Sequence, residues 1–163
     1  MQSDNPLFSM SNVLESVCHV AEHSNMMRSI VHYIAPSERF RSKYCFEDRF
    51  VEATRVLEKY PSRIPVICER SVSCTTEPLP HDPKKKFLIP RDMTIGQFVY
   101  VIRRRMKLAP EIAIFMFLVK ENSNGTFSKT LAPSAHTIDA VYSRYRNKDH
   151  FLYTEISGEN CFG

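Results

Sequence analysis

The sequence has no tryptophan and only four glycines among 163 residues, and these shortages exclude several classes of protein. The glycines lie far apart, so no glycine-rich loop that could hold a phosphate group can form. The five cysteines are odd in number and form no CxxC pair, which argues against a disulfide framework or a zinc knuckle. We therefore expect free thiols in a reducing compartment.

Long hydrophobic runs are also missing. The longest extends from Ile112 to Val119, whereas a helix that spans a bilayer needs about 20 apolar residues. Residues 1–5 lack the basic and apolar regions of a secretory signal. With 43% hydrophobic and 25% charged residues, the composition is that of a globular protein, and we expect a cytoplasmic location.

Positive charge is concentrated between residues 84 and 107. This stretch holds eight lysines and arginines against one acidic residue, Asp92, although the net charge is only +4. Such a field attracts nucleic acid, an anionic membrane or an acidic peptide, and charge alone does not choose among them. Because no helix-turn-helix, zinc or aromatic-platform signature is present, we expect no specific nucleic-acid partner.

Hydrophobic periodicity predicts the helices and strands. Helical spacing is found over residues 12–34, in a short segment opened by Ser37, over 46–59, from Thr94 to about Met106, and after Thr137. Short alternating or continuous apolar patterns predict strands over residues 63–69, 85–90, 113–119 and 150–156. Two hairpin strands, a crossover helix and further strands on one sheet make an α+β fold, and the β-grasp of ubiquitin-like proteins fits this order.

Three strand features are specific enough to test. Pro65 favours an edge position or a strand start for residues 63–69. The apolar run over residues 113–119 is typical of a central strand that is covered on both faces. Residues 120–135 predict a long loop around Asn124-Gly125.

Two helices show a predicted buried stripe. In the helix over residues 46–59 the stripe consists of Phe46, Phe50, Ala53 and Leu57. The next helix opens with a capping box, Thr94-Ile95-Gly96-Gln97, in which the threonine hydroxyl and the glutamine amide satisfy free backbone amides. We expect this helix to bury Phe98, Val101 and Ile102.

From about Phe40 to its end, the chain resembles the autophagy ubiquitin-like modifiers, the GABARAP and light-chain-three group. Seven stretches carry the resemblance, in order: residues 46–49, 59–67, 84–90, 93–98, 102–105, 151–153 and 157–163. It implies a β-grasp with two additional N-terminal helices. The expected division is an N-terminal extension over 1–36, a ubiquitin-like domain with its helical subdomain over 37–156, and a flexible conjugation tail over 157–163.

The resemblance also implies a non-enzymatic function without cofactor or metal. Gly163 would be exposed by a processing protease, activated, and joined by conjugating enzymes to phosphatidylethanolamine on the autophagosome membrane, with Phe162 recognised by these enzymes. The protein would be cytoplasmic before lipidation and would recruit cargo receptors through their short linear motifs. A polar tail that ends in a residue without a side chain fits a narrow active-site channel.

The basic strand over residues 84–90 is the expected docking edge, because an unpaired strand invites an extended peptide. The resemblance places an aromatic-accepting pocket at Glu52, Val56, Pro65, Ile67, Lys86, Leu88 and Phe151. It places a second, aliphatic-accepting pocket at Phe87, Ile89, Pro90, Met93, Phe98, Val101, Ile102 and Arg105. Arg63, Lys84 and Arg105 are candidates for pairing with acidic residues of the peptide.

Other interpretations remain open at this point. The chain could be a ubiquitin-like binding module that works without conjugation, or a basic microtubule- or nucleic-acid-associated protein. His19 and His23 have helical spacing for two metal ligands, but the sequence offers no third ligand nearby. Cys68 lies in a strand pattern, where a small buried hydrophobic residue is expected rather than a nucleophile.

Deletion of residues 1–36 should leave a folded domain, because the β-grasp elements are complete from about Ser37. If the amphipathic segment packs on the domain, its loss costs stability in proportion to the apolar area removed, at about 25 cal/mol per Å². Thermal unfolding followed by circular dichroism measures both effects. A truncated protein that melts without a cooperative transition would show instead that the segment is part of the core.

Overall fold

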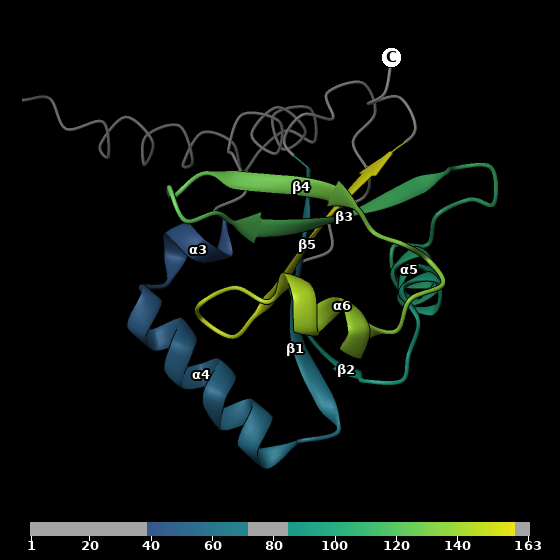
Figure 1. Ribbon diagram of the computed structural model, residues 1–163. Coiled ribbons are helices and arrows are strands. Elements are labelled where there is room, and N and C mark those ends of the chain that lie inside the picture. The colour runs from purple at the N-terminus through teal and green to yellow at the C-terminus, as the bar shows by residue number, and fades with distance from the viewer. Residues whose placement is uncertain (1–38, 72–84, 159–163) are drawn as a thin grey trace, which may run out of the picture. The chain divides into compact units, whose positions relative to one another are not determined.

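The computed structural model describes residues 39–71 and 85–158 (Figure 1). All described residues belong to one compact unit, which covers residues 39–163. The predicted helix over 12–34 and the predicted roles of Lys84, Phe162 and Gly163 therefore lie outside the described residues. None of the described helices is long and apolar enough to cross a membrane.

Five strands form one mixed sheet in the order β2-β1-β5-β3-β4. The strands are β1 (Arg63–Arg70), β2 (Lys86–Pro90), β3 (Ile114–Glu121), β4 (Phe127–Leu131) and β5 (Leu152–Gly158). β1 and β5 run parallel at the middle of the sheet, and the other neighbouring pairs are antiparallel. The β-grasp prediction is confirmed, including the two helices that precede the first strand.

Side-chain alternation gives the sheet two apolar faces. The helices are α3 (Phe40–Lys43), α4 (Phe46–Lys59), α5 (Ile95–Arg105) and α6 (Ile138–Tyr145). One face packs against α5 and α6, and its buried residues include Ile64, Val66, Leu118, Leu152, Phe98, Ile102, Ile138 and Val141. The other face packs against α3 and α4 through Phe40, Ala53, Ile67, Val119, Phe151 and Tyr153.

The structure corrects two of the three strand predictions and confirms the other. Residues 127–131 form a strand, β4, inside the stretch predicted as a loop, and all five of its residues are exposed. The prediction for residues 113–119 is confirmed, because β3 is paired on both sides and contributes Met116 and Leu118 to one core cluster and Val119 to the other. Pro65 lies neither at an edge nor at the start of a strand. It is tolerated because the parallel pairing with β5 begins only at Val66, so the amide that Pro65 lacks has no ladder partner on that side.

The helix predictions hold in outline. The capping box is present, because the Thr94 hydroxyl accepts from the Gln97 amide and the Gln97 side chain accepts from the Thr94 amide. Phe98 and Ile102 are buried, but Val101 is 42% exposed, because its position lies at the flank of the stripe that faces the sheet. In α4 only Ala53 is fully buried. Phe46 and Phe50 instead stack on each other at the surface, with ring centroids 6.0 Å apart.

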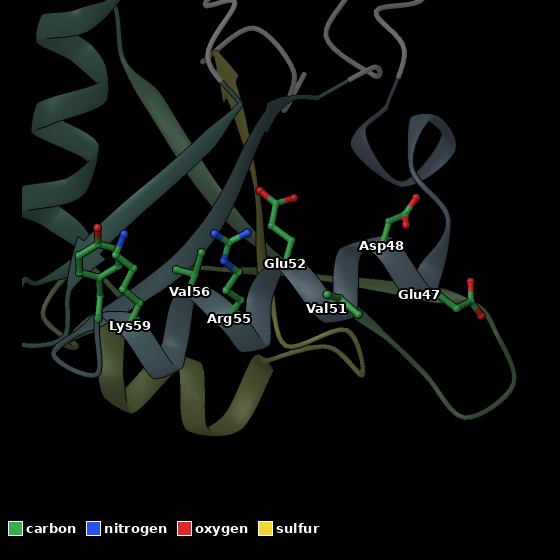
Figure 2. A pocket seen from close by; sticks show the side chains of 8 residues that line it. Glu47, Asp48, Val51, Glu52, Arg55, Val56 and Lys59 are labelled. Atoms are coloured by element: carbon green, nitrogen blue, oxygen red, sulfur yellow. The ribbon is translucent and has the colours of Figure 1, made fainter.

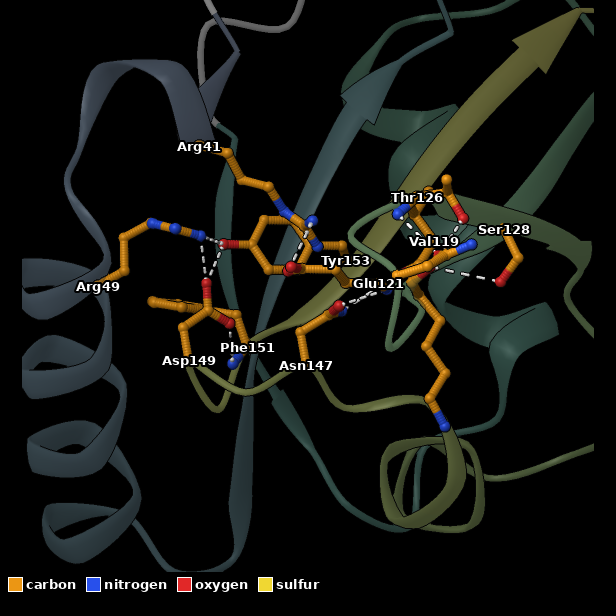
Figure 3. A network of polar contacts seen from close by, with 12 residues as sticks. Arg41, Arg49, Val119, Glu121, Thr126, Ser128, Asn147, Asp149, Phe151 and Tyr153 are labelled. Carbon is orange, nitrogen blue, oxygen red and sulfur yellow. Dashed lines mark hydrogen bonds and ion pairs between the residues drawn. The ribbon is translucent and has the colours of Figure 1, made fainter.

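One buried carboxylate fastens α4 to the end of the sheet (Figure 3). Asp149, in the turn before β5, pairs with Arg49 of α4 and accepts a 2.6 Å hydrogen bond from the Tyr153 hydroxyl. It also accepts from the Phe151 amide at 3.3 Å. Burial, together with the neighbouring Asp149 carboxylate, raises the pKa of Tyr153, so this phenol stays protonated and continues to donate. The same turn is tied to β3, where Asn147 donates to the Val119 carbonyl.

Replacement of Asp149 by alanine should lower the free energy of unfolding by roughly 3–5 kcal/mol, because Arg49 would remain as a largely buried charge without its partner. Urea unfolding measures the change. Asp139→Ala is the matched control, because its pair with Arg91 is exposed on both sides and should be worth about 1 kcal/mol or less. Equal losses in the two variants would contradict the role assigned to Asp149.

Candidate functional site

The outer edge of β2 carries unpaired backbone groups. The hydrogen bonds from Cys68 to Lys85 and from Arg91 to Ser62 flank the β1–β2 ladder and fix which residues face β1. Because bonded residues alternate in an antiparallel pair, Lys86 and Leu88 direct their N–H and C=O groups away from β1. Within the described residues, no strand pairs with this edge. The edge-strand prediction is confirmed.

The residues predicted for the first pocket lie on the sheet face that α3 and α4 cover. Pro65 is opposite Leu88 and Ile67 is opposite Lys86 in the strand register, so these four side chains share that face. Ile67 and Phe151 are 0% and 2% exposed and form the floor. Glu52 and Val56, one helical turn apart on α4, are half-buried and form a wall.

Lys86 joins the strand edge to this wall. Its ammonium lies 2.7 Å from Glu52 Oε1. It also lies 5.5 Å and 5.6 Å from the ring centroids of Phe40 and Tyr44, which is within the range of a cation–π contact. Both charged side chains are about half exposed, so the ion pair is weak and can open when another group enters.

The residues predicted for the second pocket lie on the opposite face, between β2 and α5. The Phe87 ring meets the Phe98 ring edge-on at 5.5 Å, and the Arg105 guanidinium lies 5.6 Å from the Phe87 centroid. Ile89, Phe98 and Ile102 are core residues and form the floor rather than the opening. Val101 is exposed, and Pro90 and Met93 are half-buried, so these side chains form the accessible rim together with Phe87.

Basic groups lie at both pockets. Arg63 reaches along the edge and donates to the Leu88 carbonyl at 3.4 Å, which is a long hydrogen bond that an incoming carboxylate can replace. Lys85 is 3.4 Å from Glu69, so part of the predicted basic field is already neutralised within the domain. Arg105 is exposed at the second pocket.

The residue-by-residue prediction missed Phe40 and Tyr44. The rings of Phe40, in α3, and of Tyr44, which caps α3, lie 4.9 Å apart, and they extend the apolar surface beyond Phe151, which is 5.4 Å from Phe40. The available signal was an aromatic pair at helical spacing directly before α4. An open strand edge with apolar side chains on each face and basic groups beside both is chemically suited to bind an extended, acidic peptide.

Comparisons with known proteins agree with this geometry. The family model described as "Autophagy protein Atg8 ubiquitin like" matches residues 48–163. The chain is 47% identical to Autophagy-related protein 8 of Vanderwaltozyma polyspora over 124 residues, which cover 76% of this chain and 95% of that protein. It is 44% identical to Autophagy-related protein 8d of Arabidopsis thaliana, with 76% and 93% covered.

Solved structures are similar over the same region. The crystal structure of Trypanosoma brucei ATG8 matches with a TM-score of 0.62 and 36% identity, covering 74% of this chain and 94% of that chain. Plasmodium falciparum Atg8, solved in complex with a Plasmodium falciparum Atg3 peptide, matches with a TM-score of 0.61 and 27% identity, covering 73% and 94%.

Proposed function

The chain belongs to the Atg8 family of ubiquitin-like autophagy proteins, which are not enzymes, and on that premise we propose that it is a lipid-conjugated modifier read by short peptides. Gly163 is joined to phosphatidylethanolamine, and the modifier then passes from the cytoplasm to the autophagosome membrane. There β2 binds receptors that carry an aromatic-x-x-aliphatic motif. The activating and conjugating enzymes and a processing protease act on its tail.

The open β2 edge, with partly exposed apolar side chains on each face, is the observation that carries the peptide-binding part of the proposal. In an extended peptide, residues separated by an odd number of positions point to opposite faces. An aromatic residue and an aliphatic residue three positions later can therefore enter the two pockets together, while the peptide backbone bonds to Lys86 and Leu88. Acidic residues before the aromatic residue would meet Lys84, Lys85 and Arg63.

A related complex supports one class of ligand. The Plasmodium falciparum Atg8 structure contains a peptide of Atg3 from the same organism. We propose that the corresponding conjugating enzyme of this chain's pathway also offers a peptide to β2. Recruitment of the enzyme and of receptors would then be successive uses of one edge.

The conjugation part rests on the tail sequence and on the position of β5. β5 includes Ser157 and extends through Gly158, which places Ser157 in the buried strand rather than in the tail. Five residues follow Gly158, and fully extended they span at most about 18 Å. A tail of that length can bring Gly163 into an enzyme channel while the folded domain stays outside.

Gly163→Ala should abolish conjugation to phosphatidylethanolamine and leave the melting temperature and peptide affinity unchanged, because a methyl group obstructs a channel shaped for glycine. The assay is liposome flotation after incubation with the conjugation enzymes and ATP. Asn160→Ala is the matched control, since it alters the tail but keeps the terminal residue. Lipidation of the alanine variant at the parental rate would refute the assignment.

Leu88→Ala should weaken the binding of an acidic aromatic-x-x-aliphatic peptide by roughly 1–4 kcal/mol, because the substitution removes a wall of the first pocket. Isothermal titration gives the affinity. Thr130→Ala, on the exposed strand at the other sheet edge, should have no effect.

The spacing of the peptide gives an independent check. Removal of one spacer places both anchor side chains on the same face, so the shortened peptide should lose at least about tenfold in affinity, or 1.4 kcal/mol. Replacement of Lys84 and Lys85 by glutamate should lower the affinity for the peptide, and this loss should become smaller as the salt concentration rises. Equal affinity for the two peptides would show that the pockets are not used as described.

A further inference from the structure

α4 presents a second surface, which includes Glu52 and Val56 of the first pocket and extends beyond them along the exposed side of the helix. A shallow hollow of about 510 Å³ lies along this side (Figure 2). All of its described lining residues belong to α4 or to Tyr60, which caps it: Glu47, Asp48, Val51, Glu52, Arg55, Val56, Lys59 and Tyr60. They form two neighbouring ridges with four-residue spacing, one from Glu47 to Lys59 and the other from Asp48 to Tyr60.

The charges and apolar residues of these ridges are self-complementary. On the two ridges, the acidic side chains lie in the N-terminal half of α4 and the basic ones in the C-terminal half. About the midpoint between Ala53 and Thr54, Glu47 lies opposite Tyr60, and the other six lining residues each have a complementary counterpart at the same distance on the other side. The pairs are Asp48 with Lys59, Val51 with Val56, and Glu52 with Arg55.

This arrangement is what a two-fold axis requires. In a symmetric dimer the same patch lies on both subunits, and residue i of one copy meets residue j of the other while j meets i. Ridges with four-residue spacing are also those that interdigitate in the commonest class of helix packing. A second α4 placed across the first, about the midpoint, would bring the valines together, Asp48 onto Lys59 and Glu52 onto Arg55.

Two of these groups, Val51 and Arg55, are left open to another molecule by the part of the domain that the structure describes. Val51 is 63% exposed. In the described part of the chain, Arg55 takes part in no ion pair or hydrogen bond, although Glu52 lies one turn away. Glu52 is instead drawn to Lys86 through Oε1 alone. A carboxylate has room for further donors, so Glu52 can keep Lys86 and accept from an arginine of another molecule.

We propose that the outer side of α4 is a self-association surface, through which two copies of this chain pair about a two-fold axis. A helix of 14 residues is about 21 Å long, so the contact is smaller than the roughly 1,200 Å² of a stable interface. The dimer is therefore weak and forms only at high protein concentration.

Sedimentation velocity of the full chain, over a concentration series at low salt, tests the proposal. The average mass should rise toward that of a dimer. Asp48→Lys alone, and Lys59→Asp alone, should each weaken association by about fivefold or more, because each places like charges opposite one another. The double variant Asp48→Lys/Lys59→Asp exchanges the charges and should restore association to near the parental value.

Two further variants separate a specific contact from a general effect of charge. Glu58→Lys changes the net charge as Asp48→Lys does, but lies on α4 outside both ridges, and should leave association unchanged. Arg55→Glu removes a central pair without altering the first turn of the helix and should abolish association. A chain that stays monomeric at all concentrations, a failed rescue by the double variant, or an equal effect of Glu58→Lys would each overturn the proposal.

Discussion

The buried contact between Arg49 and Asp149 determines where α4 crosses the sheet, and both surfaces discussed above depend on that position. The two residues are 100 positions apart, yet one carboxylate receives the guanidinium, the Tyr153 hydroxyl and the Phe151 amide. Burying a charge is unfavourable unless such donors satisfy it. Because Phe151 is the floor of the first pocket and α4 is its wall, the same carboxylate sets the width of the pocket.

The local part of this architecture is readable in the sequence. Helical periodicity, the Thr94 capping box and the alternating pattern of β2 each require only neighbouring residues, and the structure agrees with all three. β4 was missed because Phe127–Leu131 buries none of its residues, and hydrophobic patterning detects only burial. The contacts of Arg49 and of Phe40 join segments about 100 residues apart, which no local pattern encodes. The pocket residues came from family resemblance rather than from spacing.

The two edges of the sheet differ in what flanks them. Among residues 39–71 and 85–158, β4 has an open edge like that of β2, but all five of its side chains are exposed. Its central residue, Lys129, lies 2.6 Å from the buried Glu155, which holds a positive charge where another strand would approach. Charged residues on an edge discourage indiscriminate pairing. At β2, Lys86 provides a similar charge but is held by an exposed pair that can open, so the edge can admit a peptide that fills the pockets.

Glu52 and Val56 belong both to the wall of the first pocket and to the ridges of α4. A second copy that covers these side chains therefore excludes the aromatic residue of a peptide, and a bound peptide excludes the second copy. By linkage this coupling is reciprocal. The factor by which a bound second copy lowers the affinity for the peptide is also the factor by which a bound peptide lowers the affinity for the second copy. Tethering copies to one membrane raises their effective concentration and shifts the balance toward pairing. Receptors would then have to displace a weak partner from a densely modified membrane, which favours peptides that fill both pockets over peptides that fill only one.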